Sequence, residues 1–353
     1  MRCSGLLRSV STLLLLGGAC ATTRPARVDP SVTPMLPSPR GDLYTRAPGM
    51  PNDPLVASVA GGLPWDETLS GVATAVALAH VAKEPVDACR VRWMAVLAGY
   101  PYPVRGWRTA DAALGEVPEP LLAEARAQAA RRVDVGLVRA RDGEVDRWVL
   151  VVGERTADLP PIPREVPVGD TVTLGAGSWV VSDALGELRA AEGTFVADTP
   201  GEWLVAARAG ATTLAAFPIY VGETSPKAPP LGCLAGTGDA ASRADTALVG
   251  LRATYAFPAV ARDPALDSVA RARLRAYAAG ETLPNARDQL RAAGVIGVPV
   301  AAGACRAATV EACLAAMWWS PEDRGALVGD VAEYGLALEE SRGEVRMVVV
   351  GAG

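Results

Sequence analysis

Histidine and aromatic residues are scarce in this chain of 353 residues. His80 is the only histidine, and Phe, Trp and Tyr together make up 5% of the sequence. A metal site with two histidine ligands cannot be built from one histidine, and a Ser-His-Asp or Cys-His arrangement would need His80 itself to meet a nucleophile. No Gly-x-Ser-x-Gly or cysteine-protease signature accompanies it. We therefore interpret His80 as an ordinary helix-face residue, with a functional role as the alternative.

The chain also lacks any block of charge of one sign. Its formal net charge is −5, and Lys83 and Lys227 are the only lysines among 34 basic residues. A nucleic-acid-binding protein would show a basic patch or stripe, and neither lysine lies in a phosphate-loop motif. The composition therefore predicts no nucleic-acid partner, and no motif indicates a cofactor.

Long apolar runs are absent except for a short one near the N-terminus. Arg2 and Arg8 precede the apolar residues Val10 to Leu16, and small residues follow up to Cys20. The run is too short for a retained membrane helix, and its layout is that of a secretory signal peptide. LLLLGGAC resembles a lipoprotein cleavage box with Cys20 as the lipidated residue; ordinary cleavage after Ala21 is the alternative. We expect an exported protein, lipid-anchored to the bacterial outer membrane and facing the periplasm or the cell surface.

Cysteine usage agrees with export. Four cysteines would remain after cleavage: Cys89, Cys233, Cys305 and Cys313. An even number in an exported chain favours disulfides, with three possible pairings. Cys305 and Cys313 bracket a short loop-to-helix segment, so we expect that pair. A Cys89–Cys233 disulfide is then possible.

An internal repeat organises the chain. The paired segments lie at an offset close to 197: 66-DETLSGVATAVALAHVA-82 with 263-DPALDSVARARLRAYAA-279, 133-VDVGLVRA-140 with 332-AEYGLALE-339, and 147-RWVLVVG-153 with 345-VRMVVVG-351. The first pair predicts amphipathic helices that begin with an acidic residue, and the others predict β-hairpins. His80 is matched by Tyr277, an exchange typical of a packing or surface position.

The segments around the repeat have a different texture. Residues 21–53 are rich in Pro, Thr, Ser and Gly, which is typical of a tether. Between the copies, short strands alternate with Gly, Asp and Pro turns, which predicts a small immunoglobulin-like β-sandwich. The predicted order is a signal peptide (1–20), the tether (21–53), a first copy (54–158), the β-sandwich (159–223), a linker (224–240) and a second copy (241–353).

The C-terminal copy resembles the bacterial CAP domains, the SCP-like relatives of cysteine-rich secretory, antigen 5 and pathogenesis-related proteins. The resemblance is carried by Asp263-Pro264-Ala265-Leu266, Leu290-Arg291-Ala292-Ala293-Gly294, Trp319-Ser320-Pro321 with Arg324, and Glu333-Tyr334-Gly335. It implies an α+β fold, with two CAP-like αβα sandwiches flanking the β-sandwich. It also implies a groove in which family members collect histidines and glutamates, and in which some bind divalent metal.

This sequence departs from the family pattern at the groove. Asp323 occupies the histidine position of the family's Ser-Pro-Gly-His-Arg segment, and Ala304 falls where a glutamate is expected. Glu333 is retained, with Asp134 as its counterpart in the first copy. We therefore predict no metal and no catalytic residues, and a tentative ligand groove formed by Asp323, Glu333, Tyr334 and Trp319.

The function that follows is a non-catalytic binding or interaction module at the cell envelope. Its partners would be the membrane, through the lipid anchor, and a small apolar ligand or an envelope protein. A cryptic hydrolase that uses Glu333, Asp323 or Asp134 with a water molecule is the first alternative. A purely structural envelope spacer is the second.

Overall fold

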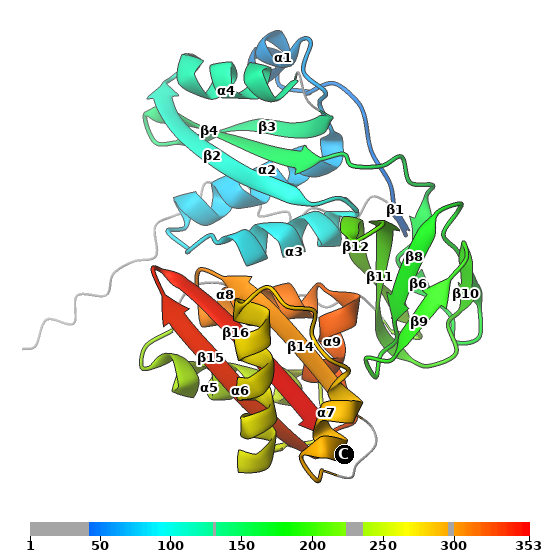
Figure 1. Ribbon diagram of the computed structural model, residues 1–353. Coiled ribbons are helices and arrows are strands. Elements are labelled where there is room, and N and C mark those ends of the chain that lie inside the picture. The colour runs from blue at the N-terminus through cyan, green and yellow to red at the C-terminus, as the bar shows by residue number, and fades with distance from the viewer. Residues whose placement is uncertain (1–41, 130–131, 224–235, 296–299) are drawn as a thin grey trace, which may run out of the picture. The chain divides into compact units, whose positions relative to one another are not determined.

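The computed structural model describes residues 42–129, 132–223, 236–295 and 300–353. Cys20, the signal peptide, most of the tether and Cys233 lie outside these ranges. Helices and strands both recur along the described chain, as Figure 1 shows, so the α+β class is confirmed. No helix in the described ranges is both long and apolar enough to cross a bilayer.

The N-terminal copy, from α1 to β4, is a three-stranded antiparallel sheet covered by helices on both faces. The strands are ordered β2-β4-β3. Helices α2 and α3 pack on one face, while α1 and α4 pack on the other (Figure 1). The elements are α1 (Pro54–Ala60), α2 (Glu67–Val81), α3 (Ala88–Ala98), β2 (Val104–Ala113), α4 (Glu119–Ala129), β3 (Val133–Asp142) and β4 (Val145–Glu154).

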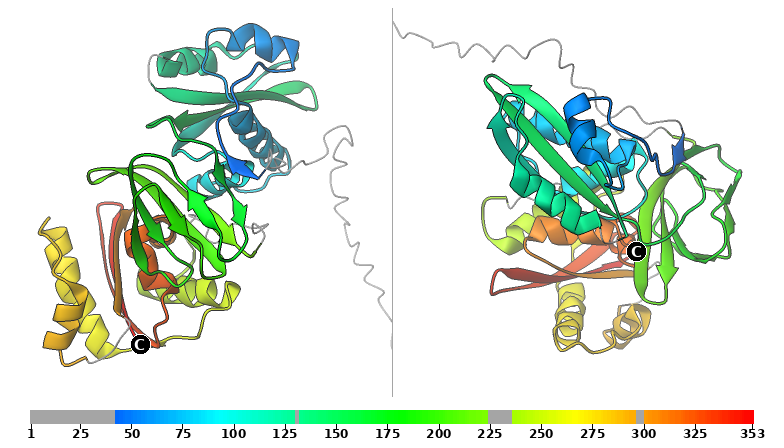
Figure 2. Two further views of the ribbon diagram at one scale, coloured as in Figure 1. Left: turned by 90° about the vertical axis from the view of Figure 1, so that its right-hand side faces the viewer. Right: turned by 90° about the horizontal axis from the view of Figure 1, so that it is seen from above.

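The C-terminal copy, from α5 to β16, repeats this plan. Its sheet is ordered β13-β15-β16-β14. Helices α6 and α7 lie on one face of the sheet and α5, α8 and α9 on the other, which Figure 2 shows from the side. The elements are α5 (Ala240–Thr254), β13 (Ala261–Arg262), α6 (Pro264–Ala278), α7 (Ala286–Ala292), β14 (Val300–Ala307), α8 (Val310–Trp318), α9 (Pro321–Val328), β15 (Glu333–Ser341) and β16 (Glu344–Ala352).

In both copies a glycine on the strand lets the long helix pack closely against the sheet. A Cβ added to Gly136 on β3 would lie 2.2 Å from the backbone carbon of Leu69 on α2. A Cβ added to Gly335 on β15 would lie 2.1 Å from the same atom of Leu266 on α6. Only glycine allows so close an approach between helix backbone and strand. The helix and its strand therefore meet in the same way in both copies.

The start of each long helix is also equivalent. Asp66 caps α2 by accepting from the Leu69 N–H, and Asp263 caps α6 by accepting from the Ala265 N–H. The backbone N–H of each cap donates to the edge of the neighbouring strand, from Asp66 to Val135 O at 2.8 Å and from Asp263 to Tyr334 O at 2.9 Å. The residue before each helix is thereby fixed beside the strand.

The hairpin register corrects the repeat by one residue. Gly136 lies opposite Val151, and Gly335 lies opposite Val350. Both pairs give an offset of 199, whereas matching the last strands by their shared Val-Val-Gly ending gives 198. A slip of one residue would turn each side chain to the other face of the sheet, so the packing against the helices decides the register.

The middle of the chain forms a five-stranded sheet and a two-stranded sheet. Their orders are β6-β12-β11-β8-β9 and β10-β7, and a further pair joins β1 to β5. The strands are β1 (Leu43–Tyr44), β5 (Ile162–Pro163), β6 (Glu165–Val166), β7 (Thr171–Thr173), β8 (Ser178–Ser182), β9 (Leu188–Ala191), β10 (Thr194–Val196), β11 (Gly201–Ala209) and β12 (Thr212–Val221).

Candidate functional site

Asp323, at the position of the family histidine, lies in the first turn of α9 with both carboxylate oxygens in use. Its Oδ1 accepts from the Ala304 backbone N–H at 3.0 Å, and its Oδ2 accepts from the Ser320 hydroxyl at 2.6 Å. Burial raises the pKa of Asp323, and the bonds from Ser320 and Ala304 offset part of that rise. The carboxylate therefore joins α9 to β14.

Glu333 is exposed at the first residue of β15 and does not approach Asp323. Ala304, the partner of Asp323, aligns through β16 with Ala337, and Glu333 lies four residues before Ala337. Two strand spacings and four residues along a strand place Glu333 roughly 16 Å from Ala304. The two carboxylates do not form one site.

The two aromatic residues of the tentative groove are buried. Trp319 is 8% exposed and Tyr334 is 4% exposed. The Tyr334 hydroxyl donates to Asp245 Oδ1 at 3.0 Å. Burial first, and then the Asp245 charge, raise the pKa of Tyr334 to about 12, so it stays neutral at physiological pH. Neither ring offers an open platform for a ligand.

The arginine of the Trp-Ser-Pro segment is also buried. Arg324 is 1% exposed, donates to Glu202 Oε1 at 2.8 Å, and lies with its guanidinium 4.2 Å from the centre of the Trp318 ring. An arginine buried to this extent is not accessible to a substrate carboxylate or phosphate. Sequence similarity alone did not indicate this internal pairing.

The remaining residues named from the sequence occupy structural positions. Cys305 on β14 and Cys313 on α8 form a disulfide with Cα atoms 5.4 Å apart. Cys89 is buried on α3, and Cys233, with which a disulfide was considered, lies outside the described residues. His80 lies near the end of α2, where partial burial and then the positive charge of Arg147 lower its pKa. His80 is therefore neutral near pH 7.

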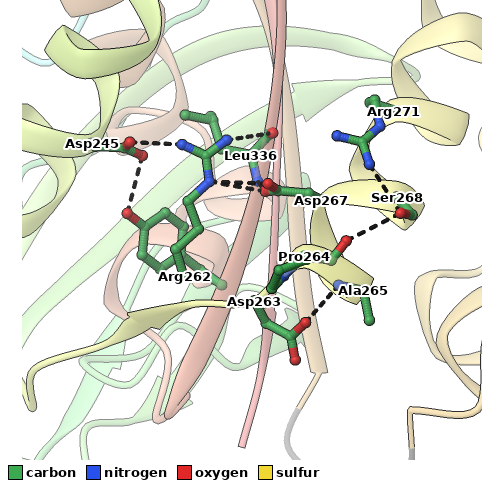
Figure 3. Close-up of polar contacts among 10 residues, drawn as sticks. Asp245, Arg262, Asp263, Pro264, Ala265, Asp267, Ser268, Arg271 and Leu336 are labelled. Carbon is green, nitrogen blue, oxygen red and sulfur yellow. Dashed lines mark hydrogen bonds and ion pairs between the residues drawn. The ribbon is translucent and has the colours of Figure 1, made fainter.

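A polar network closes the edge of β15 beyond the short strand β13, between the two helix layers (Figure 3). The Arg262 guanidinium donates to Asp245 on α5 at 2.7 Å and to Asp267 on α6 at 3.1 Å, and it approaches the Leu336 carbonyl at 3.4 Å. Asp267 Oδ1 also accepts from the Leu336 backbone N–H at 2.8 Å. A carboxylate and a guanidinium thus satisfy both backbone groups that Leu336 presents at this edge.

The same edge in the N-terminal copy has no such network. The equivalents of Arg262, Asp267 and Leu336 are Trp65, Ser70 and Leu137. The Ser70 hydroxyl donates along its own helix, to the Asp66 carbonyl at 3.1 Å. Trp65 is 8% exposed, and its Nε1 has no hydrogen-bond partner among the described residues. The side chains of Ser70 and Trp65 therefore do not take over the hydrogen bonds that Asp267 and Arg262 make to the backbone of the equivalent residue.

A cavity of about 670 Å³ lies at this edge of β3. Its size falls within the usual range of ligand pockets, about 300–1,000 Å³. Trp65, Val56 and Leu137 form a buried apolar floor, while Asn52 and Thr74 are exposed, so the cavity opens to solvent. The full lining is Pro51, Asn52, Asp53, Val56, Trp65, Glu67, Thr68, Ser70, Gly71, Thr74, Ala98, Leu137, Val138 and Arg139.

An ion-pair cluster holds the rim of this cavity. Arg139 on β3 donates to Asp53 at 2.9 Å and to Asp146 at 3.0 Å. Asp53 also caps α1 by accepting from the N–H groups of Leu55 and Val56. Burial alone would raise the pKa of Asp53, but Arg139 and the two backbone donors hold it below its ordinary value. The rim is therefore held together by ion pairs and keeps a net charge of −1 from this cluster.

Asp134, the counterpart of Glu333, lies close by but is not available to a ligand. It is 0% exposed, and its two oxygens accept from Arg46 at 2.6 and 2.9 Å. The Tyr100 hydroxyl also reaches it at 3.3 Å. Asp134 therefore anchors the segment before α1 to the start of β3.

Comparison with known proteins yields little beyond these motifs. No family model matches the chain, and no curated protein matches it. One solved structure is similar, an extracellular protein containing a SCP domain from Bacillus anthracis str. Ames. The match has 12% sequence identity and a TM-score of 0.26, and it covers 62% of this chain and 81% of that chain. The similarity to CAP domains therefore rests on the sequence motifs alone.

Proposed function

We propose that this chain is an exported, non-catalytic binding protein of the bacterial envelope, anchored through Cys20, whose ligand occupies the cavity beside β3. The observation that carries the proposal is the difference between the two copies at one position of the fold. The C-terminal copy closes the edge with Arg262, Asp245 and Asp267. The N-terminal copy has a cavity of about 670 Å³ there, lined by Trp65, whose buried indole N–H has no partner among the residues that the structure describes.

The absence of catalysis is part of the proposal, and the state of the carboxylates supports it. A general acid or base must reach its substrate, whereas Asp134 and Asp323 have both oxygens occupied by partners within the protein. Glu333 is exposed and lies far from Asp323. If a purified sample of the protein shows hydrolytic activity, we expect the Glu333→Ala variant to show the same activity.

Native mass spectrometry of the mature chain, extracted gently from bacterial membranes, tests the binding role. Thr74→Trp should fill the cavity, because Thr74 is exposed on its lining and its hydroxyl donates along α2 to Ser70 O. The matched control is Arg271→Trp at the equivalent, exposed position of α6. We expect added mass in the wild type and in Arg271→Trp, and its loss in Thr74→Trp. Added mass that persists in Thr74→Trp, or none in any variant, contradicts the proposal.

The denatured masses from the same samples test the anchor. Acylation at Cys20 adds the mass of the lipid to the chain, while cleavage after Ala21 leaves an unmodified chain that begins at Thr22. Each disulfide lowers the mass by two hydrogens. These readings are independent of what the cavity binds.

A further inference from the structure

The geometry of the open edge points to the chemistry of the ligand. Val135 and Leu137 are two residues apart on β3, so their backbone groups point to the same side of the strand. Val135 uses that side to bind the segment before α2, with its N–H donating to Pro64 O at 2.9 Å and its carbonyl accepting from Asp66 N at 2.8 Å. The N–H and carbonyl of Leu137 therefore point into the space beyond Trp65, where the cavity lies.

The C-terminal copy shows what such an edge takes up. At Leu336, the equivalent of Leu137, a carboxylate oxygen accepts from the N–H and a guanidinium N–H faces the carbonyl. An occupant of the N-terminal cavity must likewise supply one acceptor and one donor, spaced to match a strand edge. Trp65 also lines the cavity, and its Nε1 is a buried donor with no partner in the described part of the chain, so an acceptor on the occupant that reached Nε1 would satisfy it.

An amino-acid residue in extended conformation, flanked by two secondary amides, meets these requirements. Its own N–H and its own carbonyl belong to different amides but point to the same side, so one donates and the other accepts as in a β-ladder, which is how peptides add to exposed sheet edges. We propose that the cavity beside β3 binds a short extended peptide main chain carrying an apolar side chain, through Leu137 and Trp65. This inference rests on the proposed binding function and adds the ligand class to it.

The walls favour an apolar side chain over a charged one. Val56, Trp65 and Leu137 are each at most 8% exposed and provide the floor. Arg139 pairs with both Asp53 and Asp146, so this cluster keeps a net charge of −1 that disfavours an anionic side chain. A charged side chain of either sign would also lose hydration against the apolar floor.

The test uses the full chain labelled with ¹⁵N and titrated with N-acetyl-leucine N-methylamide, which has two secondary amides and one apolar side chain. We expect saturable shifts of the Leu137 amide and the Trp65 indole N–H, with a dissociation constant on the order of 1 mM for a ligand of this size. Trp65→Phe identifies the indole signal and should weaken binding several-fold. The analogue methylated on both amide nitrogens should bind at least tenfold more weakly, because it cannot donate to Leu137 O.

Two variants separate this site from the rest of the molecule. Thr74→Trp should abolish the shifts, and Arg271→Trp should leave them unchanged. Ser70→Asp is a second, independent block, because it places a carboxylate where Asp267 closes the other copy. Unchanged shifts in both Thr74→Trp and Ser70→Asp would place binding elsewhere and overturn the proposal.

The remaining outcomes are also decisive. Equal binding of the methylated analogue would refute the amide site while leaving an apolar binding cavity in place. Absence of any shift with the secondary amide would refute the peptide class, and the native mass measurement would still decide whether the cavity binds another ligand.

Discussion

Substitution of Gly335 by alanine should be among the most destabilising single changes in the C-terminal copy. The added Cβ would lie 2.1 Å from the Leu266 backbone carbon, 2.3 Å from its oxygen and 2.4 Å from the Asp267 nitrogen. Ordinary contacts between carbon atoms are about 3.5–4.0 Å, so α6 would have to retreat by more than about 1 Å. Leu266 is 0% exposed and Val269 is 6% exposed, so that movement would loosen the core beneath the helix.

Overpacking typically costs about 1–3 kcal/mol, and the blocking atoms here are helix backbone, so we expect a loss of about 3 kcal/mol. With a urea dependence of about 1–3 kcal/mol per molar, the unfolding midpoint should fall by roughly 1 M or more. Gly136→Ala should behave in the same way in the N-terminal copy. Gly250→Ala is the control, since an added Cβ meets nothing within 4 Å in the middle of α5, and it should stabilise slightly. A midpoint shift in Gly335→Ala no larger than that of the control would refute the close-approach argument.

Three further predictions concern the C-terminal copy. Asp267→Ala removes the acceptor of the Leu336 N–H and a partner of Arg262. It should lower the free energy of unfolding, measured in urea, by about 1–3 kcal/mol. Ser70→Ala at the equivalent position should lower it distinctly less, and equal losses would contradict the assigned roles. Joint replacement of Cys305 and Cys313 by alanine opens a loop with a sequence separation of 8 and should lower the free energy of unfolding by about 2.5 kcal/mol, which a comparison of oxidised and reduced wild type checks independently. Burial raises the pKa of Asp323 above 3.8, so the stability it contributes is complete below that pH and is lost as pH rises through the raised pKa. Asp323→Asn should therefore gain on the wild type as pH rises toward neutrality, and parallel stability curves from pH 3 to 7 would argue against this assignment.

Much of the fold could be predicted from residue patterns because these act locally. Asp66 and Asp263 mark helix starts that the structure contains, because a short acidic side chain satisfies the free N–H groups of the first turn. The apolar hairpins around Gly143 and Gly343 are present as β3–β4 and β15–β16. The pairing of Cys305 with Cys313 also followed from their closeness in the chain. The register of the last strand could not be predicted in this way. A shift by one residue moves every side chain to the other face of the sheet, but the apolar run in the sequence stays the same.

The candidate site was the part that sequence reasoning located poorly. Family resemblance drew attention to Asp323, Glu333, Tyr334 and Trp319, yet two of these are buried in the protein interior and the two carboxylates lie far apart. Trp65 was not singled out, because a tryptophan just before a helix is more often part of a core. The significance of Trp65 depends on the contrast with the equivalent Arg262, which is paired with Asp245 and Asp267, whereas the Trp65 N–H has no partner in the described part of the chain.

The sequence by itself determined the α+β class, the repeated helix–hairpin plan and the presence of a single histidine, because each depends on residue type and short-range spacing. Only the tertiary structure decided which sheet edge is closed and which is open. In the C-terminal copy, Asp267 and Arg262 reach the backbone of Leu336, although they lie more than sixty positions away in the chain. The equivalent residues do not do this at Leu137, where the cavity lies. Pairing over such separations is set by packing between layers, which no local pattern records.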